Sequence, residues 1–388
     1  MIRRAVRAMS ALLGCIALLA APSLQANPAL PQVARDGFTI ATAPYRYSWP
    51  LDHASHPGYQ TEWWYYTGHL KTRAGRSFGY ELTFFRFGLR PGDPRPPPGR
   101  SKWRGNELYP AHFAITDEQG KTFFYDVRFA REALQMGAAA AGTLAVRADD
   151  WSLTGSPLRG HPAMERMVLH AGDETQEGRN AIDLVQLPQK PPAIHGHGGV
   201  SRKSHCFSCA SHYYSYTRLH TAGTLEFQGR RYAVDGLSWM DHEYGSAELQ
   251  PDQAGWDWFS VQLDDRREIM AYVLRQKDGS ITAESAGSLI APDGSVRYLP
   301  RGAFTVVSTG TWKSPHTGAT YPSGWRLQVP SAKIDIALQP TVSDQELAVT
   351  SGGVSYWEGA VAATAAATAR ALGVGYVELT GYAGAVSL

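Results

Sequence analysis

The residues best suited to chemistry lie in one stretch, Gly236–Ser246, which reads GLSWMDHEYGS. It places two acids and a histidine between a tryptophan and a tyrosine, with glycines near both ends that we expect to form turns. A carboxyl group packed among aromatic rings loses hydration, which raises its pKa and favours its protonated form. Asp241, beside Trp239 and Tyr244, is therefore a candidate general acid.

The same stretch also has a structural interpretation. Asp241, His242 and Glu243 would then form a buried polar knot, paired with arginine and backbone groups where two domains meet. Both interpretations stay open for these three residues on sequence grounds.

A second cluster follows Glu62, where four large aromatic residues stand in a row. In a strand, alternate side chains face opposite sides, so Trp63 and Tyr65 would share one face and Glu62 the other. Glu62 would face a ligand cavity or form a salt bridge with an arginine such as Arg86. Aromatic walls suit a flat or polyene-like apolar ligand. We predict that the following residues line such a cavity: Glu62, Trp63, Trp64, Tyr65, Tyr66, Trp256 and Trp258.

The segment Pro188–Ser211 is a long irregular stretch that contains a Cys-Phe-Ser-Cys sequence. Cys206 and Cys209 would form a tight disulfide if the protein is exported, because exported compartments oxidise thiols. Zinc is an alternative, since nearby histidines could complete a ligand set with the two sulfurs. Free thiols are the third possibility. The histidines in question are His195, His197, His205 and His212.

The N-terminus is typical of a signal peptide. Arg3, Arg4 and Arg7 precede an apolar run, and Leu24–Ala26 offers a cleavage site, so we exclude residues 1–26 from the fold. We expect a soluble protein that is periplasmic or secreted. The alternative is a lipoprotein anchored at Cys15, because the residues before it resemble a lipoprotein box.

Charge and motifs exclude several classes of function. Removal of residues 1–26 takes away three arginines and lowers the formal net charge from +2 to about −1, so no basic excess points to nucleic acid. No later run reaches the roughly 18 apolar residues of a membrane span. The sequence contains no GxSxG, P-loop or HExxH motif, and we expect neither a bound metal nor a cofactor.

Many short strand-like runs, with turn signals every ~8–12 residues, predict an all-β barrel or sandwich protein. Thr224–Phe227 and Arg231–Asp235 should form a hairpin closed by Gln228 and Gly229. Trp256–Leu263 alternates apolar and polar residues and should pair with Arg267–Arg275. An irregular lead-in would occupy residues 27–46, and the boundary between two β-rich halves should fall near residue 245.

These residues together resemble the AttH/CrtC family of exported lipocalin-like proteins, which includes carotenoid 1,2-hydratases. The similarity runs over about Tyr45–Ala383. It rests on these segments, in this order: EWWYYTGHL at Glu62, SYTRL at Ser215, GLSWMDHEYGS at Gly236, GWDWFSVQLDD at Gly255, YPSGW at Tyr321, DQEL at Asp344, YWEG at Tyr356 and GYVELTGY at Gly375.

The resemblance implies two lipocalin-like, calycin-type antiparallel β-barrel domains, residues 47–245 and 246–388, with a cavity near their junction. It implies a hydratase that adds water to an isoprenoid or carotenoid double bond without a cofactor. Asp241 matches the position of the hydratase acid, and Trp239 and Tyr244 would shape and stabilise its site. The alternative is an AttH-like carrier of lipids or apolar metabolites that works with an ABC-type permease and is not an enzyme.

Overall fold

The computed structural model describes residues 33–34, 36–91, 105–247, 249–349 and 353–386. The predicted signal peptide and Cys15 lie outside these residues. Almost all regular structure is antiparallel strand, and the α-helix is absent from the described part of the chain, which has only four short 3-10 turns. None of its helical segments has the length and apolar character needed to cross a bilayer.

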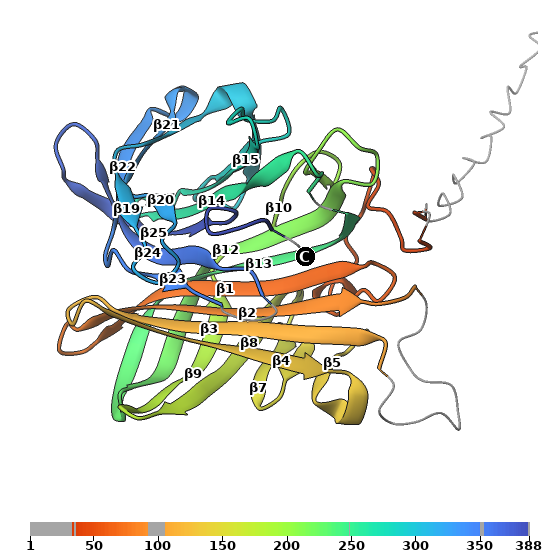
Figure 1. Cartoon of the computed structure of the whole chain (residues 1–388), viewed down its shortest axis with the longest axis horizontal. Helices are drawn as coiled ribbons and strands as arrows, with labels where there is room; N and C mark the ends of the chain where they lie inside the picture. The colour runs from red at the N-terminus through yellow and green to blue at the C-terminus, as the bar shows by residue number, and fades with distance from the viewer. Residues whose placement is uncertain (1–32, 35, 92–104, 248, 350–352, 387–388) are drawn as a thin grey trace, which may run out of the picture. The chain divides into compact units, whose positions relative to one another are not determined.

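The first sheet contains the N-terminal strands and curls until its ends meet, because β3 and β4 contact β5 and β6 (Figure 1). Its strand order is β4-β3-β2-β1-β13-β12-β9-β8-β7-β6-β5, with β10 and β11 paired to β12. The bounds are β1 Thr61–Thr72, β2 Ser77–Gly88, β3 Glu107–Asp117, β4 Thr122–Arg131, β5 Gly137–Ala139, β6 Ala145–Ala148, β7 Trp151–Leu158, β8 His161–Thr175, β9 Gly178–Pro188, β10 Ala193–Ile194, β11 Ser201–Arg202, β12 Ala210–Phe227 and β13 Arg230–Ala247.

The second sheet contains the C-terminal strands in the order β17-β16-β15-β14-β25-β24-β22-β21-β18, with β23 paired to β24. Strands β19 and β20 form a separate hairpin. The bounds are β14 Gln253–Leu263, β15 Glu268–Gln276, β16 Ala286–Ile290, β17 Val296–Pro300, β18 Thr305–Ser308, β19 Thr311–Lys313, β20 Thr320–Pro322, β21 Trp325–Val329, β22 Ile334–Pro340, β23 Glu346–Leu347, β24 Tyr356–Ala365 and β25 Ala371–Leu379.

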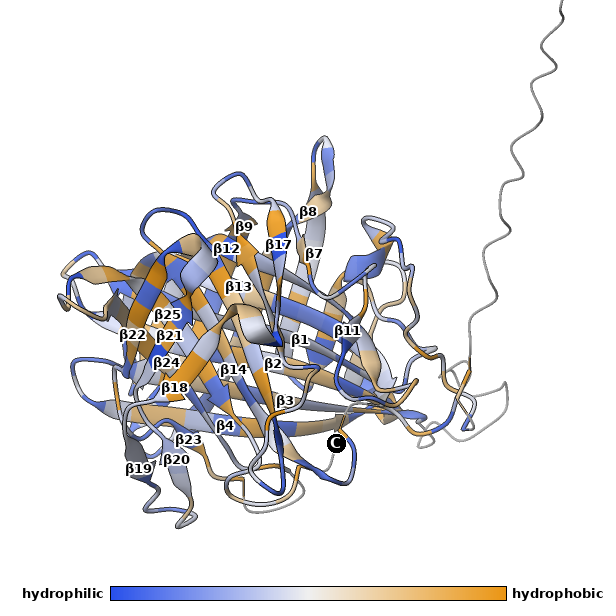
Figure 2. Cartoon of the chain, turned by 90° about the horizontal axis from the view of Figure 1, so that it is seen from above, coloured by the Kyte–Doolittle hydropathy of each residue, from blue (hydrophilic) through white to orange (hydrophobic). Residues whose placement is uncertain are grey.

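The four 3-10 turns are η1 Leu51–His53, η2 Ala133–Gln135, η3 Arg301–Ala303 and η4 Pro330–Ala332. Each sheet encloses an apolar core, and a third apolar cluster lies where the two sheets face each other. Figure 2 shows that hydrophobic residues concentrate on the strands. Phe259, Val261 and Leu263 fill the core of the second sheet, whereas Trp258 belongs to the cluster at the junction. The predicted alternation along this strand is therefore correct.

The hairpin of β12 and β13 turns at Gln228 and Gly229, both with positive φ, as predicted. The prediction that glycines close both ends of Gly236–Ser246 is wrong. The whole stretch lies inside β13. Gly236 is required there by close strand spacing, because a Cβ at this position would stand 2.0 Å from the carbonyl oxygen of His69 on β1.

The predicted all-β class is confirmed: two antiparallel sheets curl into barrel and half-barrel shapes. The last strand of the first sheet ends at Ala247, and the first strand of the second sheet begins at Gln253. All described residues from Val33 onward belong to one compact unit.

Candidate functional site

A cavity of about 660 Å³ lies where the outer faces of the two sheets meet. Its first wall includes residues from β1, β2, β3, β4, β12 and β13, and its second wall includes residues from β14, β15, β24 and β25. Small-molecule sites typically occupy roughly 300–1,000 Å³ and favour apolar walls with a few polar groups. The aromatic and titratable residues that border the cavity include Trp63, Tyr65, Glu81, His112, Lys203, Tyr213, Asp241, Glu243, Trp256, Trp258, Tyr356, Glu358 and Glu378.

Strand alternation decides which predicted residues reach this cavity. Trp63 and Tyr65 face it from β1, Asp241 faces it from β13, and Trp256 and Trp258 face it from β14. Tyr65 and Asp241 are direct cross-strand partners, so their side chains stand next to each other on the cavity wall.

Five predicted site residues do not border the cavity: three that we expected in its wall and two that we expected beside Asp241. Trp64 and Tyr66 point into the core of the first sheet. Glu62 and Tyr244 lie on that same opposite face, where Tyr244 stacks on His56 with ring centroids 3.6 Å apart. Trp239 is on the same face of β13 as Asp241 and packs in the junction cluster beside Trp258, but it does not itself border the cavity; it donates a hydrogen bond to Asp241.

Asp241 is 4% exposed, and its carboxyl oxygens accept hydrogen bonds from three side chains. Tyr213 donates to Oδ2 at 2.5 Å, Trp239 donates Nε1–H to Oδ1 at 2.6 Å, and Ser215 also donates to Oδ1. Burial nevertheless raises the pKa of Asp241 to about 7, although these donors oppose the rise. The group is therefore neutral often enough to give up a proton, and its anion is stabilised as it forms.

The donors of Asp241 are themselves held in place. Trp258 donates Nε1–H to the Tyr213 hydroxyl at 3.0 Å, so that hydroxyl is free to donate to Asp241. His195 Nε2 lies 2.7 Å from the Ser215 hydroxyl, and burial lowers the pKa of His195 to about 3. Since Ser215 donates to Asp241, the neutral His195 must donate from Nε2. These contacts fix the orientation of the carboxyl group.

Three further acids that sequence reasoning missed also border the cavity. Glu81 on β2, Glu358 on β24 and Glu378 on β25 face it, and Glu358 and Glu378 are direct cross-strand partners. Burial raises the pKa of Glu81 to about 7 and that of Glu378 to about 8. Burial and the neighbouring carboxyls raise the pKa of Glu358 as well. Carboxyl groups that crowd one site favour protonation of some of them.

Two tyrosines cross the junction in opposite directions. Tyr65, on the first sheet, donates to Glu358 Oε1 at 2.7 Å. Tyr356, on the second sheet, donates to Glu81 Oε1 at 2.9 Å and lies 2.7 Å from His112 Nδ1. Each sheet therefore supplies the donor for a carboxyl group of the other, and this ties the two walls of the cavity together.

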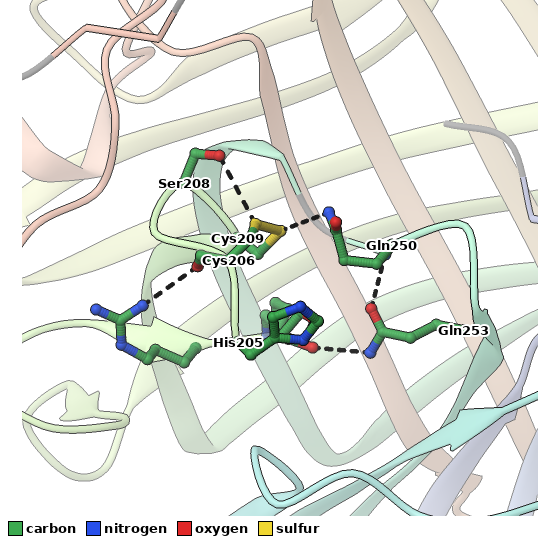
Figure 3. Close-up of a disulfide and its surroundings, with 9 residues drawn as sticks. His205, Cys206, Ser208, Cys209, Gln250 and Gln253 are labelled. Atoms are coloured by element: carbon green, nitrogen blue, oxygen red, sulfur yellow. Dashed lines mark hydrogen bonds between the residues drawn. A yellow bond between two sulfur atoms is a disulfide. The ribbon is translucent and has the colours of Figure 1, made fainter.

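Cys206 and Cys209 are joined by a disulfide in a loop beside the cavity (Figure 3). The Cys209 carbonyl accepts a hydrogen bond from the Lys203 amide at 2.9 Å. Lys203 then reaches Glu243 at 2.5 Å, above the rings of Tyr213 and Tyr272. The sulfurs bind each other, so they are not available for the zinc set considered above.

The histidines considered for the zinc alternative make other contacts. His195 contacts Ser215 and Ser288, whereas His212 stacks on Tyr45. His197 packs against Tyr298, with ring centroids 4.0 Å apart.

Glu62 forms a buried charged network with Arg86, which is the salt bridge that the sequence suggested. Arg86 Nε lies 2.9 Å from Glu62 Oε2, and both side chains are fully buried. His56 and His242 contact Oε1 at 2.8 and 2.9 Å. One possible ligand atom from each of His56, Glu62 and His242 lies within 4.8 Å of the other two, a spacing that could hold a metal ion. Arg86 already balances the charge of Glu62, and together these donors occupy its lone pairs, so the arrangement fits a structural role.

Local sequence offers only a weak signal for the missed acids. Glu81 and Glu378 occur in the similar segments GYELT and GYVELT, and Glu358 occurs in YWEG. These segments meet in the structure, because a Cβ at Gly79 would stand 2.6 Å from the Tyr376 hydroxyl oxygen. In the sequence, the signal that could have pointed to these three acids is the aromatic residue that stands close to each of them.

Comparison with known proteins shows the relationships of the chain. The AttH-like family matches residues 40–382. An AttH candidate from Nitrosomonas europaea is 30% identical, with 89% of this chain and 100% of that chain covered and a TM-score of 0.76. Kievitone hydratase from Nectria haematococca is 15% identical, with coverage of 90% and 97% and a TM-score of 0.61. The structure of CghA with Sch210972 is 11% identical, with coverage of 91% and 98% and a TM-score of 0.52.

The last two proteins are similar to this chain in fold alone, and no curated protein sequence matches it. The match over residues 40–382 covers both sheets and every residue placed at the cavity above. The lipocalin-like architecture expected from the sequence is thereby confirmed. The chain belongs to the AttH-like family.

Proposed function

We propose that the protein binds an apolar, unsaturated small molecule in the junction cavity and adds water across one of its double bonds without a cofactor. The observation that carries this proposal is Asp241, a buried acid with a pKa raised to about 7 in a cavity walled by Trp63, Tyr65, Trp256 and Trp258. The resemblance to carotenoid 1,2-hydratases supports an acyclic isoprenoid as the substrate.

The reaction needs a proton and a water molecule. Asp241 gives its proton to one carbon of the double bond, and the aromatic faces stabilise the positive charge on the adjacent carbon. Water attacks that carbon and loses a proton, which leaves the alcohol as the only product. Trp239, Tyr213 and Ser215 stabilise the Asp241 carboxylate that forms in the first step.

We further propose that the mature chain works outside the cytoplasm. The Cys206–Cys209 disulfide supports this location, because such bonds persist in oxidising compartments. The signal peptide expected at residues 1–26 supports the same location.

The test compares binding with turnover. The mature protein and an Asp241→Asn variant are incubated with an acyclic carotenoid in oxygen-18 water, and products are analysed by mass spectrometry. The wild type should form a labelled alcohol, and the variant should lose about 10²–10⁴-fold in rate while it still quenches tryptophan fluorescence on binding. Loss of binding together with turnover would contradict the assigned role of Asp241.

The carrier hypothesis predicts a different result. A lipid or apolar-metabolite carrier that works with an ABC-type permease would bind the carotenoid and form no alcohol in either protein. Native mass spectrometry of the purified protein, followed by lipid extraction, then identifies the ligand it carries. That outcome replaces the hydratase proposal with the carrier.

A further inference from the structure

We propose that Glu81 and Glu358 form the base of this site: they share one proton at rest, and the remaining carboxylate takes a proton from the attacking water. This inference rests on the proposed function, since it assigns the second half of the same reaction. It concerns two acids, one on each wall of the cavity: Glu81 on the first sheet and Glu358 on the second.

The two carboxyl groups belong to different sheets and border the same cavity. Tyr356 and Glu358 stand two residues apart on β24, so their side chains share a face. The Tyr356 hydroxyl reaches Glu81, whereas Glu358 receives the Tyr65 hydroxyl. Each acid is 1% exposed.

Each acid has one oxygen left over for a ligand. Oε1 of Glu81 accepts from Thr83 and Tyr356, and Oε1 of Glu358 accepts from Tyr65. Oε2 of both residues is buried, and no hydrogen-bond partner for it occurs among the described residues. A buried carboxyl oxygen without a partner is costly, and both residues border the cavity. Two unpaired acceptors on side chains that border one cavity are suited to hold a water molecule.

The charge in the pair follows from its surroundings. Glu378 lies opposite Glu358 on β25, and repulsion from both Glu81 and Glu378 acts on Glu358. Tyr65, Tyr356 and His112 are the other titratable groups in hydrogen-bond contact with this cluster. Burial lowers the pKa of His112 to about 4, so His112 adds no positive charge at neutral pH. In the described part of the chain no ion pair joins either carboxyl to a cation, and Asp241 repels Glu358 as well, so we infer that the pair holds one proton.

The pair completes the reaction with balanced atoms. Asp241 gives a proton to one alkene carbon, the water oxygen bonds to the other carbon, and the proton released by that water goes to the free carboxylate of the pair. After the alcohol leaves, the pair returns this proton to Asp241 through water. Tyr65 contacts Glu358 through its hydroxyl and is the cross-strand partner of Asp241, so one residue of the wall neighbours both the acid and the base.

The first test needs no substrate. Infrared titration follows the carbonyl band of protonated carboxyls in the wild type, in Glu81→Gln and in Glu358→Gln. The wild-type pair should release its two protons in two steps, the second at the higher pH. In either variant the remaining acid no longer experiences the charge of its partner. It should therefore release its proton at a lower pH than the second wild-type step. Identical titration of the remaining acid in wild type and variant would overturn the shared proton.

The second test uses the acyclic carotenoid assay in oxygen-18 water. Glu358→Gln should lose at least about 100-fold in kcat, with binding within a few-fold of the wild type. The Asp241→Asn/Glu358→Gln double variant should lose little more than the Asp241→Asn variant, because without the proton from Asp241 no cation forms for the water to attack. If Glu358→Gln does not fold, Tyr65→Phe tests the same assignment, and it should lower kcat while binding is retained.

Glu165→Gln is the matched control. Glu165 is also buried, with an unpartnered Oε2 and a pKa raised by burial to about 7, but it does not border the cavity. The control should lose an infrared band and keep its turnover. If Asp241→Asn is inactive while both glutamate variants work at wild-type rates, only the base assignment fails. A wild type that forms no alcohol overturns the proposed function and this inference together.

Discussion

The Tyr65 hydroxyl on the first sheet donates a 2.7 Å hydrogen bond to Oε1 of Glu358 on the second sheet. This bond and its counterpart between Tyr356 and Glu81 join the two walls of the cavity. Both bonds are buried, so each contributes more to stability than an exposed bond of the same length.

Tyr65→Phe should therefore destabilise the protein, because Glu358 loses the hydroxyl that donates to its Oε1 and stays buried. We expect a loss of about 1–3 kcal/mol in the free energy of unfolding. Urea unfolding followed by tryptophan fluorescence measures it. An unchanged midpoint would show that the bond adds nothing to the contact between the sheets.

Arg86 should be among the most sensitive positions for stability. It is fully buried between Glu62 and Glu107, so Arg86→Met leaves two buried acids without their cation. The expected loss is about 3–5 kcal/mol, measured by urea unfolding. Arg326→Met breaks an exposed pair with Asp335 and should cost only about 0–1 kcal/mol. Equal losses in the two variants would contradict this account.

The raised pKa of Glu165 should make the free energy of unfolding depend on pH. Burial raises its pKa to about 7, whereas an unfolded chain ionises glutamate near about pH 4.3. Between these values the folded state holds a proton that the unfolded state has lost. The stabilisation is therefore complete below the lower value and is lost as pH rises through the higher one.

Glu165→Gln removes this titration. Relative to the variant, the wild type should lose on the order of 1–3 kcal/mol of unfolding free energy between about pH 5 and about pH 8. Urea unfolding at several pH values measures both proteins. Parallel pH profiles would show that Glu165 keeps an ordinary pKa in the folded state.

Loss of the Cys206–Cys209 disulfide should affect ligand binding in the cavity as well as the stability of the protein. Replacement of Cys206 and Cys209 by serine should cost about 2 kcal/mol or less, because the closed loop is short. It should also weaken ligand binding, because this loop holds Lys203 against Glu243 at the cavity. A reducing agent should reproduce both effects in the wild type and change nothing in the double serine variant. Equal binding in all samples would separate the loop from the site.

Strand alternation could be predicted from the sequence wherever aromatic and polar residues alternate. It placed Trp63 and Tyr65 on one face and Glu62 on the other, as the structure does. The same rule explains why Tyr244, contrary to expectation, does not lie beside Asp241 at the cavity. Asp241 and Tyr244 are three residues apart, so on one strand they face opposite sides, whereas Trp239 and Asp241 share a face. The error came from the expectation of turns at the glycines.

The missed acids show what a single sequence does not contain. Glu81, Glu358 and Glu378 are isolated acids in three strands, and such residues usually face solvent. They become buried because the outer faces of two sheets pack together, and that packing pairs segments almost three hundred residues apart. Local propensity and periodicity describe each strand and leave its partner across the junction undefined.

The division of the cavity between two sheets also orders its assembly during synthesis. The strand that carries Asp241 leaves the ribosome well before β24 and β25, which carry Glu358 and Glu378. A nascent chain therefore has the acid long before it has the opposite wall, and the cavity stays open until the final strands have been added. The same arrangement suits split-protein complementation: a chain divided between Ala247 and Gln253 should recover the cavity only when both fragments reassociate.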